Sequence, residues 1–213
     1  MRELPIFPLE VVLFPRQVLP LHIFEQRYRI MIRSCIENSE PFGVVLTSHQ
    51  LSDAVYGIGT TARIVEVENL PDGRMNIVTI GEQRFKILNV RVSEHGYLIA
   101  QVLDAPLEVG SPDEESLARS LRKFVRRYIE LLTKTKRIRL ERVEVPTAPM
   151  DLALFTAVIL QASLEDKQLL LAQDRLSDLL FAERAYLEYE FQLIRVVESA
   201  VRPPEGIASF SVN

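Results

Sequence analysis

The sequence predicts an α+β fold in which a β-rich first half is followed by a helical second half. Residues 1–109 contain short alternating or β-branched apolar segments separated by turn residues, a pattern typical of strands. After residue 110 the apolar residues recur at helical spacing, and no strand pattern returns. The 47% hydrophobic content is enough for a globular core. We therefore expect a β subdomain over 1–109, a helical bundle over 110–203 and a loose C-terminal tail over 204–213.

The strands of the first half are expected in the segments FGVVL, TARIVEVENL, MNIVTI, RFKIL and YLIAQVL. Asp72-Gly73 separates the second segment from the third, and these residue types adopt the positive φ values of a tight hairpin, so the two segments should pair antiparallel. Gly57 to Ala62 matches the G-x-G-x-x-A form of the dinucleotide fingerprint. A β-branched run follows it where that fingerprint requires a helix, so we predict a bend that leads into a strand.

A single helix is expected within the β half, at 24–38. The apolar residues that recur there at the spacing of one buried face are Phe24, Tyr28, Met31, Cys35 and Ile36. Because Cys35 lies on this stripe, we interpret it as a small core residue and not as a nucleophile.

The helical half is predicted to begin at a capping box. Ser111, Pro112 and Glu114 have the residue types that suit the N-cap, the first and the third position of a helix. Further helices are expected over 149–163, 165–172 and 175–199.

No residue pattern predicts catalysis, a cofactor or a metal site. The sequence lacks the G-x-x-x-x-G-K-[ST] loop that cradles nucleotide phosphates and the G-x-S-x-G elbow of hydrolases. Its histidines, His22, His49 and His95, belong to none of the H-x-x-x-H, C-x-x-C or H-x-E patterns that bring ligands to one metal. We therefore expect a protein that is not an enzyme, holds no cofactor and works without ATP.

The sequence also argues against a membrane or secreted protein. No stretch of 18 apolar residues occurs, and prolines interrupt the apolar N-terminal run, so neither a membrane span nor a signal peptide is expected. One cysteine in 213 residues fits a reducing compartment. A cytoplasmic location is the expectation.

Charge is unevenly distributed along the chain. The formal net charge is −4, yet the segment from Arg119 to Arg142 contains ten basic residues and two acidic ones. With Phe124 and Tyr128 interleaved, this segment suits an RNA-binding protein. The same aromatic residues lie on an apolar helical stripe, however, and the overall acidity opposes nucleic-acid binding. A solvated helix face is therefore the preferred interpretation, and RNA binding through 119–142 is the alternative.

A long ordered pattern runs through the chain. It begins with LPIFPLEVVLFPRQVLPLHIFEQRYRIMI and continues through PFGVVL, YGIGTTARIVEVENLPDGRMNIVTIGEQRFKI and YLIAQV. The second half contains LEDKQLLLAQDRLSDLLFAERAYLE. In content, order and spacing, these segments resemble the N-terminal, substrate-binding domain of the ATP-dependent Lon proteases over residues 3 to 199.

The resemblance implies a PUA-like antiparallel β pseudo-barrel with one helix, followed by a helical bundle. In that family the domain recognises polypeptide substrates and supports assembly of the protease hexamer, and an ATPase domain and a peptidase domain follow it. This sequence ends at Asn213 without them, so the resemblance implies a stand-alone binding module or adaptor and not a protease. The partners it implies are unfolded or client polypeptides, a protease or chaperone that receives them, and a further copy of the chain in a homo-oligomer.

The candidate contact residues lie between Phe14 and Arg27. Two prolines in this stretch each remove a ladder donor, which makes it a poor interior strand and leaves an edge available. The predicted apolar surface consists of Phe14, Val18 and Leu19. Its predicted polar rim, in the first turn of the helix, consists of Glu25, Gln26 and Arg27.

Overall fold

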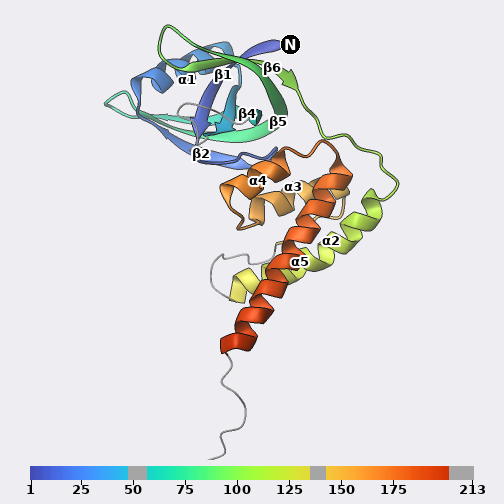
Figure 1. Cartoon of the computed structure of the whole chain (residues 1–213). Coiled ribbons are helices and arrows are strands. Elements are labelled where there is room, and N and C mark those ends of the chain that lie inside the picture. The colour runs from blue at the N-terminus through green and yellow to red at the C-terminus, as the bar shows by residue number, and fades with distance from the viewer. Residues whose placement is uncertain (48–56, 135–142, 202–213) are drawn as a thin grey trace, which may run out of the picture.

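The computed structural model describes residues 1–47, 57–134 and 143–201 (Figure 1). The tail predicted over 204–213 lies outside these residues. Figure 1 shows the strands of the first half curled into a barrel at the N-terminal end of an elongated molecule. The elements of this half are β1 (Arg2–Leu9), β2 (Val18–Ile23), α1 (Gln26–Asn38), β3 (Phe42–Leu46), β4 (Ile58–Asn69), β5 (Met75–Val92) and β6 (Leu98–Asp104).

The barrel closes because β5 is long enough to pair with three other strands. The strand order is β2-β5-β4-β3-β1-β6, and the second half of β5 also pairs with β6. The predicted antiparallel pairing is confirmed for every described strand pair except β1–β3, which is parallel with Ile6 opposite Gly43. Parallel strands need a long crossover connection, and β2 and α1 lie within the crossover here.

Both turn predictions in the barrel are confirmed. Gly73 lies at the tip between β4 and β5 with a φ of 79°. Its N–H donates to the Leu70 carbonyl at 2.9 Å, and the Leu70 N–H donates to the Arg74 carbonyl at 2.9 Å. β4 begins at Ile58, so the glycine pattern leads into a strand and not into a dinucleotide-binding helix.

The buried face of α1 differs from the predicted stripe. The residues that it buries against the barrel are Tyr28, Met31, Ile32 and Cys35. Phe24 is 61% exposed, and Ile36 is also exposed. The helix begins only at Gln26 and the backbone before it is extended, so Phe24 does not follow the helical period. The true stripe is displaced from the predicted one at both ends.

The described residues of the second half form four helices, and the three predicted from residue 149 onward are present. Their bounds are α2 (Glu114–Lys134), α3 (Pro149–Ile159), α4 (Leu164–Leu171) and α5 (Leu176–Val201). α5 packs against the other three. Together they enclose the largest of the hydrophobic cores.

The segment between β1 and β2 joins the two halves of the molecule. Val12 and Phe14 are buried in the core of the helices, while Leu13 between them is buried in the core of the barrel. Phe14 is 1% exposed, so the prediction that it lines a binding surface is wrong. Neighbouring side chains of this segment face opposite sides, and the helices cover the side on which Phe14 lies.

At Gly81, β5 passes close to this segment, and the Arg16 N–H donates to the Gly81 carbonyl at 2.6 Å. A Cβ at this position would lie 2.3 Å from the Phe14 carbonyl oxygen. We expect Gly81→Ala to lower the free energy of unfolding by about 1–3 kcal/mol, because the backbone must shift to relieve the clash. Urea unfolding measures this against Gly57→Ala, where a Cβ meets nothing within 4 Å and the change should stay within about 0.5 kcal/mol. Equal effects of the two substitutions would show that β5 and the segment between β1 and β2 are not tightly packed at Gly81.

Candidate functional site

The six predicted contact residues do not form one surface. Val18 and Leu19 are neighbours on β2 and face opposite sides of the strand: Val18 is 57% exposed, whereas Leu19 is partly buried against the barrel core. Glu25, Gln26 and Arg27 lie at the start of α1, beyond the far end of β2. At about 3.3 Å per strand residue, roughly 20 Å separates Val18 from that predicted rim. Of the predicted apolar residues, only Val18 is well exposed.

β2 is an edge strand with a free main-chain side. The Gly81 N–H donates to the Gln17 carbonyl at 2.9 Å, and Val18 lies opposite Ile80. Because bonded and non-bonded pairs alternate in an antiparallel ladder, residues 19, 21 and 23 bond to β5, while residues 18, 20 and 22 direct their main-chain groups away from it. Pro20, which has no N–H, fits an outward position. Among the described residues β2 pairs with β5 alone, so this outward edge is available to another strand.

A mainly apolar strip, exposed on β2 and half-buried on β5, lies beside this edge. We call it the β2 face, and it consists of Val18, Pro20, His22 and Phe24 with Val78 and Ile80 of β5. Val18 and Pro20 lie opposite Ile80 and Val78 in non-bonded pairs, in which side chains approach most closely. The rings of His22 and Phe24 stack with their centroids 6.1 Å apart. Phe24, which was expected in the helix core, therefore belongs to this surface.

The sequence contains a signal for the β2 face. In VLPLHIF the alternate residues Leu19, Leu21 and Ile23 are aliphatic and pack on the barrel core, which directs the residues between them outward. The predicted apolar surface ends at Leu19, which leaves out Pro20 and His22, and Phe24 was expected on the buried stripe of the helix. Recognising the strand period through residue 23 would have found them.

Polar contacts hold the α1 end of the β2 face. His22 Nδ1 lies 2.7 Å from Asn76 Oδ1, and the Asn76 amide in turn donates to a carboxylate of β4 at 2.7 Å. Arg27 pairs with Glu25 at 2.9 Å, and its guanidinium lies 4.6 Å from the centre of the Tyr28 ring. Burial raises the pKa of Tyr28, and the Arg27 charge opposes this shift. Because Glu25 and Arg27 neutralise each other, the apolar residues are the main source of attraction at this face.

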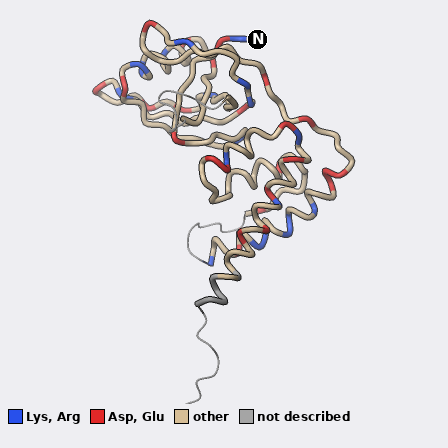
Figure 2. Tube along the Cα trace, in the orientation of Figure 1, with Lys and Arg blue, Asp and Glu red and all other residues tan. Residues whose placement is uncertain are grey.

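Several residues of the basic segment on α2 have structural roles. Figure 2 shows Lys and Arg along this helix, and the last part of the segment lies outside the described residues. Arg122 donates to two main-chain carbonyls before α3, and Arg127 lies 4.6 Å from the centre of the Phe191 ring. Tyr128 is buried, and Phe124 is partly buried in the helical core, so neither ring is free to stack on a base. The positions of these residues favour a solvated helix face.

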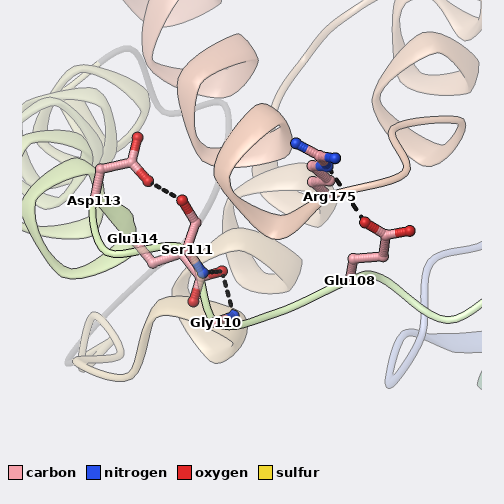
Figure 3. Close-up of polar contacts among 6 residues, drawn as sticks. All are labelled: Glu108, Gly110, Ser111, Asp113, Glu114 and Arg175. Atoms are coloured by element: carbon pink, nitrogen blue, oxygen red, sulfur yellow. Dashed lines mark hydrogen bonds and ion pairs between the residues drawn. The ribbon is translucent and has the colours of Figure 1, made fainter.

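The linker from β6 to α2 is tied to the turn between α4 and α5 (Figure 3). The Glu108 N–H donates to the Asp174 carbonyl at 2.9 Å, and the Leu176 N–H donates to the Glu108 carbonyl at 2.9 Å. The side chains of Glu108 and Arg175 form an ion pair at 3.3 Å. These contacts hold the linker against the start of α5.

The predicted capping box lies at the end of the same linker. The contact expected of its glutamate is present, and the contact expected of its serine is not. The Glu114 carboxylate accepts from the N–H groups of Gly110 and Ser111 at 2.8 and 3.0 Å. The Ser111 hydroxyl contacts the Asp113 carboxylate, where the capping box would have it accept from the backbone of Glu114 (Figure 3). α2 begins at Glu114, directly after this turn.

A pocket of about 410 Å³ lies where the barrel, the linker and α3 meet. Its apolar wall includes Leu107 of the linker and Met150 and Leu154 of α3. Its charged lining residues are Arg16, Glu82, Arg84 and Asp104. Pockets of a few hundred Å³ between domains are typical sites for small ligands or short peptide ends.

Arg84 is the buried charge of this pocket, at 4% exposure. Its Nη1 donates at 2.6 Å to the carbonyl of Gln173, in the turn between α4 and α5, whereas Nε and Nη2 have no hydrogen-bond partner among the described residues. Burial lowers the pKa of the guanidinium, and the charge of Asp174 opposes the shift. Leaving part of a buried charge unpaired is costly, so this residue does more than fill space. Nothing in the sequence around Arg84 indicated that this arginine would be buried beside a pocket.

A second exposed apolar strip follows α5. Phe181, Ala185, Tyr189 and Leu193 recur every four residues and are all exposed. Figure 1 shows α5 extending away from the barrel. The main-chain groups within a helix bond to one another, so of the two strips only the β2 face offers a free main-chain edge to an extended peptide.

Other chemical features of the described residues are few. Within 1–47, 57–134 and 143–201, no three His, Cys, Asp or Glu residues are grouped so that they could hold a metal ion. In the same ranges, no helix is long and apolar enough to cross a membrane. Cys35 is buried, and burial raises the pKa of its thiol to about 12, which keeps it protonated at neutral pH.

Comparison with known proteins gives a consistent result. Residues 3–185 match the family described as the ATP-dependent protease La (LON) substrate-binding domain. The Lon protease of Anaeromyxobacter dehalogenans is 32% identical over 173 residues, which are 78% of this chain and 20% of that protein. The Lon protease of Escherichia coli K12 is 26% identical over 201 residues, 91% of this chain and 26% of that protein. The chain thus spans about a fifth to a quarter of these relatives.

Two solved structures share the fold. The Lon N-terminal domain protein from Xanthomonas campestris has a TM-score of 0.63 at 24% identity, covering 92% of this chain and 98% of that one. The N-terminal domain of the Mycobacterium avium complex Lon protease has a TM-score of 0.66 at 18% identity, covering 88% of this chain and 98% of that one. The barrel followed by helices is therefore an arrangement that these domains have in common.

Proposed function

Because this chain belongs to the Lon substrate-binding domain family, we propose that it is a non-enzymatic module that binds unfolded polypeptide segments along the β2 face. The observation that carries this proposal is the free main-chain edge of β2 beside an exposed apolar strip. A client segment would add to β2 as an extra strand and lay its apolar side chains on Val18, Pro20 and Phe24.

This mode of binding suits clients of varied sequence. Main-chain hydrogen bonds to a strand edge do not depend on the side chains of the added peptide, and an apolar strip accepts many aliphatic or aromatic residues. Large exposed apolar surfaces on soluble domains commonly mark interaction sites. The sheet edge therefore explains how one surface could serve many unfolded segments.

The expected affinity is modest. The β2 face can bury a few apolar side chains, which contribute a few kcal/mol before the cost of ordering the peptide is subtracted. Binding of a single segment should be micromolar or weaker, so that a client can be released. In this proposal the module acts in the cytoplasm without ATP and passes clients to a separate protease or chaperone.

Replacing Val18 by aspartate together with Phe24 by serine should weaken client binding about tenfold or more, because two exposed apolar contacts are lost and a charge is placed on the strip. Fluorescein-labelled casein, which is unfolded in solution, provides the probe, and fluorescence anisotropy provides the measurement. The thermal transition should stay nearly unchanged, since both residues are exposed. The casein should also remain intact with or without ATP.

The matched control replaces Leu88 by serine and Val92 by aspartate, which are exposed residues of β5 outside the β2 face. This variant should bind casein as the wild type does. A synthetic peptide methylated on consecutive main-chain nitrogens should bind more weakly than its unmethylated form, because neither of its edges can then donate to a strand ladder. Equal loss in both double variants, or indifference to methylation, would count against binding at the β2 edge.

A further inference from the structure

We propose that the pocket between the barrel and the helices binds the C-terminal carboxylate of a polypeptide through Arg84. This deepens the proposed function, on which it rests, because it adds an end-specific contact to the sequence-tolerant binding at the β2 face. The residues that line the pocket are not those of the β2 face, so substitutions can test the two separately.

The free nitrogens of Arg84 have the geometry that a carboxylate requires. Nη1 is occupied by the Gln173 carbonyl, and the two nitrogens without partners are Nε and Nη2. Their N–H bonds point in the same direction from one edge of the planar guanidinium, so together they can donate to both oxygens of one carboxylate. The contact with Gln173 holds the guanidinium in place and leaves this edge unused.

The other charged residues that line the pocket already have partners. Arg16 pairs with Asp151, Glu82 accepts from a β4 arginine at 2.5 Å, and Asp104 pairs with Arg2 at 3.1 Å. Among the described lining residues, Arg84 is therefore the charge that lacks an oppositely charged hydrogen-bond partner. The charge of Asp174 acts on Arg84, but neither Nε nor Nη2 donates to it. These two unused donors favour a ligand that supplies a carboxylate.

The remaining wall of the pocket suits the last residue of a peptide. Leu107, Met150 and Leu154 offer apolar contact, and a volume of about 410 Å³ accommodates a terminal residue with part of its neighbour. Neither Nε nor Nη2 has water-accessible surface, so an entering carboxylate must move neighbouring side chains aside. Met150 is the apolar lining residue best suited to this, because it is unbranched and has three rotatable side-chain bonds.

The test compares three fluorescein-labelled peptides on the wild-type protein. Two share an apolar sequence that ends in leucine, one with a free C-terminal acid and one with a C-terminal amide, and the third is the amide with a glutamate before the leucine. The free acid should bind about tenfold or more tightly than either amide. Equal binding of acid and amide, or no binding of the acid, would overturn the proposal. Tight binding of the glutamate amide would overturn the assignment to the chain end.

Variants identify the residue responsible. In Arg84→Gln the acid and the plain amide should bind equally, whereas Arg91→Gln, which removes the same charge from an exposed and paired residue of β5 outside the pocket, should keep the tenfold preference. Met150→Trp should remove the preference by filling the pocket while leaving Arg84 in place. A preference that survives in a folded Arg84→Gln or Met150→Trp protein would show that the carboxylate binds elsewhere.

The outcomes also separate this inference from the proposed function. Substitutions on the β2 face should weaken the acid and the amide by the same factor, whereas Arg84→Gln should affect the acid alone. If Arg84→Gln fails to fold, as judged by circular dichroism, the wild-type comparison of acid with amide still decides the question. Loss of the acid preference with retained casein binding would leave the β2 proposal intact.

Discussion

Phe14→Ala is expected to lower the free energy of unfolding by about 3–5 kcal/mol, the range for removing a buried aromatic side chain. Phe14 is fully buried in the core of the helices, although it belongs to the segment between β1 and β2. Its loss removes a contact that joins the two halves, so we also expect the barrel and the helices to unfold in separate transitions.

Urea unfolding followed at several wavelengths measures both effects of Phe14→Ala. Phe24→Ala is the matched control, because Phe24 is the same residue type in an exposed position, and its effect should stay within about 0.5 kcal/mol. If the Phe14→Ala protein is stable and unfolds in one cooperative transition but no longer binds clients, Phe14 lies on the binding surface after all.

Glu183→Met is expected to stabilise the protein at neutral pH, and to do so increasingly as the pH rises. Glu183 of α5 is 0% exposed, and neither of its carboxylate oxygens has a hydrogen-bond partner among the described residues. Burial raises the pKa of this carboxyl well above its usual value, and the backbone of Ala157 on α3 opposes the shift only in part. Replacing an unsatisfied buried group by an apolar side chain of similar length should contribute about 1–3 kcal/mol at pH 7.

The direction of the pH dependence follows from proton binding. Between the ordinary pKa of a glutamate in the unfolded chain, about 4.3, and the raised pKa in the fold, the folded state holds a proton that the unfolded state has lost. Stability should therefore fall as the pH rises through this range, by up to about 1.4 kcal/mol per pH unit. Below it the contribution is constant.

Urea midpoints of the wild type and Glu183→Met, compared at several values from pH 4 to pH 8, measure this slope. The difference between the two proteins should widen with pH. Glu188→Gln serves as a control, because Glu188 is a more exposed residue of the same helix that pairs with Arg184, and it should change the slope little. A constant difference over the whole range would mean that folding does not shift the pKa of Glu183.

The two buried charged residues differ in what their removal should reveal. Glu183 lies inside the helical core, where burial raises its pKa and so favours the neutral form, and an apolar replacement should be tolerated. Arg84 stays charged, lines a pocket and holds the turn between α4 and α5. If the Glu183 substitution stabilises the protein, the buried carboxyl destabilises the core. If the Arg84 substitution weakens only the binding of a free C-terminal acid, the guanidinium binds a ligand.

The local elements of this protein could be predicted from the sequence. Asp72-Gly73 specifies a tight hairpin because few residue types tolerate its backbone conformation, and the structure places Gly73 at that tip. The glycines at 57 and 59 lead into a strand because β-branched residues follow. Helix α5 follows from apolar residues at helical spacing, such as Leu176, Leu180 and Leu187, which are all buried. In each case the deciding residues lie within a few positions of one another.

The tertiary structure alone decided which aromatic residue near β2 is buried and which is exposed. Phe14 and Phe24 have the same side chain, but Phe14 is covered by helices more than 100 residues later in the chain, whereas Phe24 precedes α1 and is left in solvent. The parallel β1–β3 pair and the Arg84 pocket likewise depend on segments that are distant in sequence. Periodicity reports which face of an element is apolar, but burial depends on what packs against that face, and that is determined only when the two halves meet.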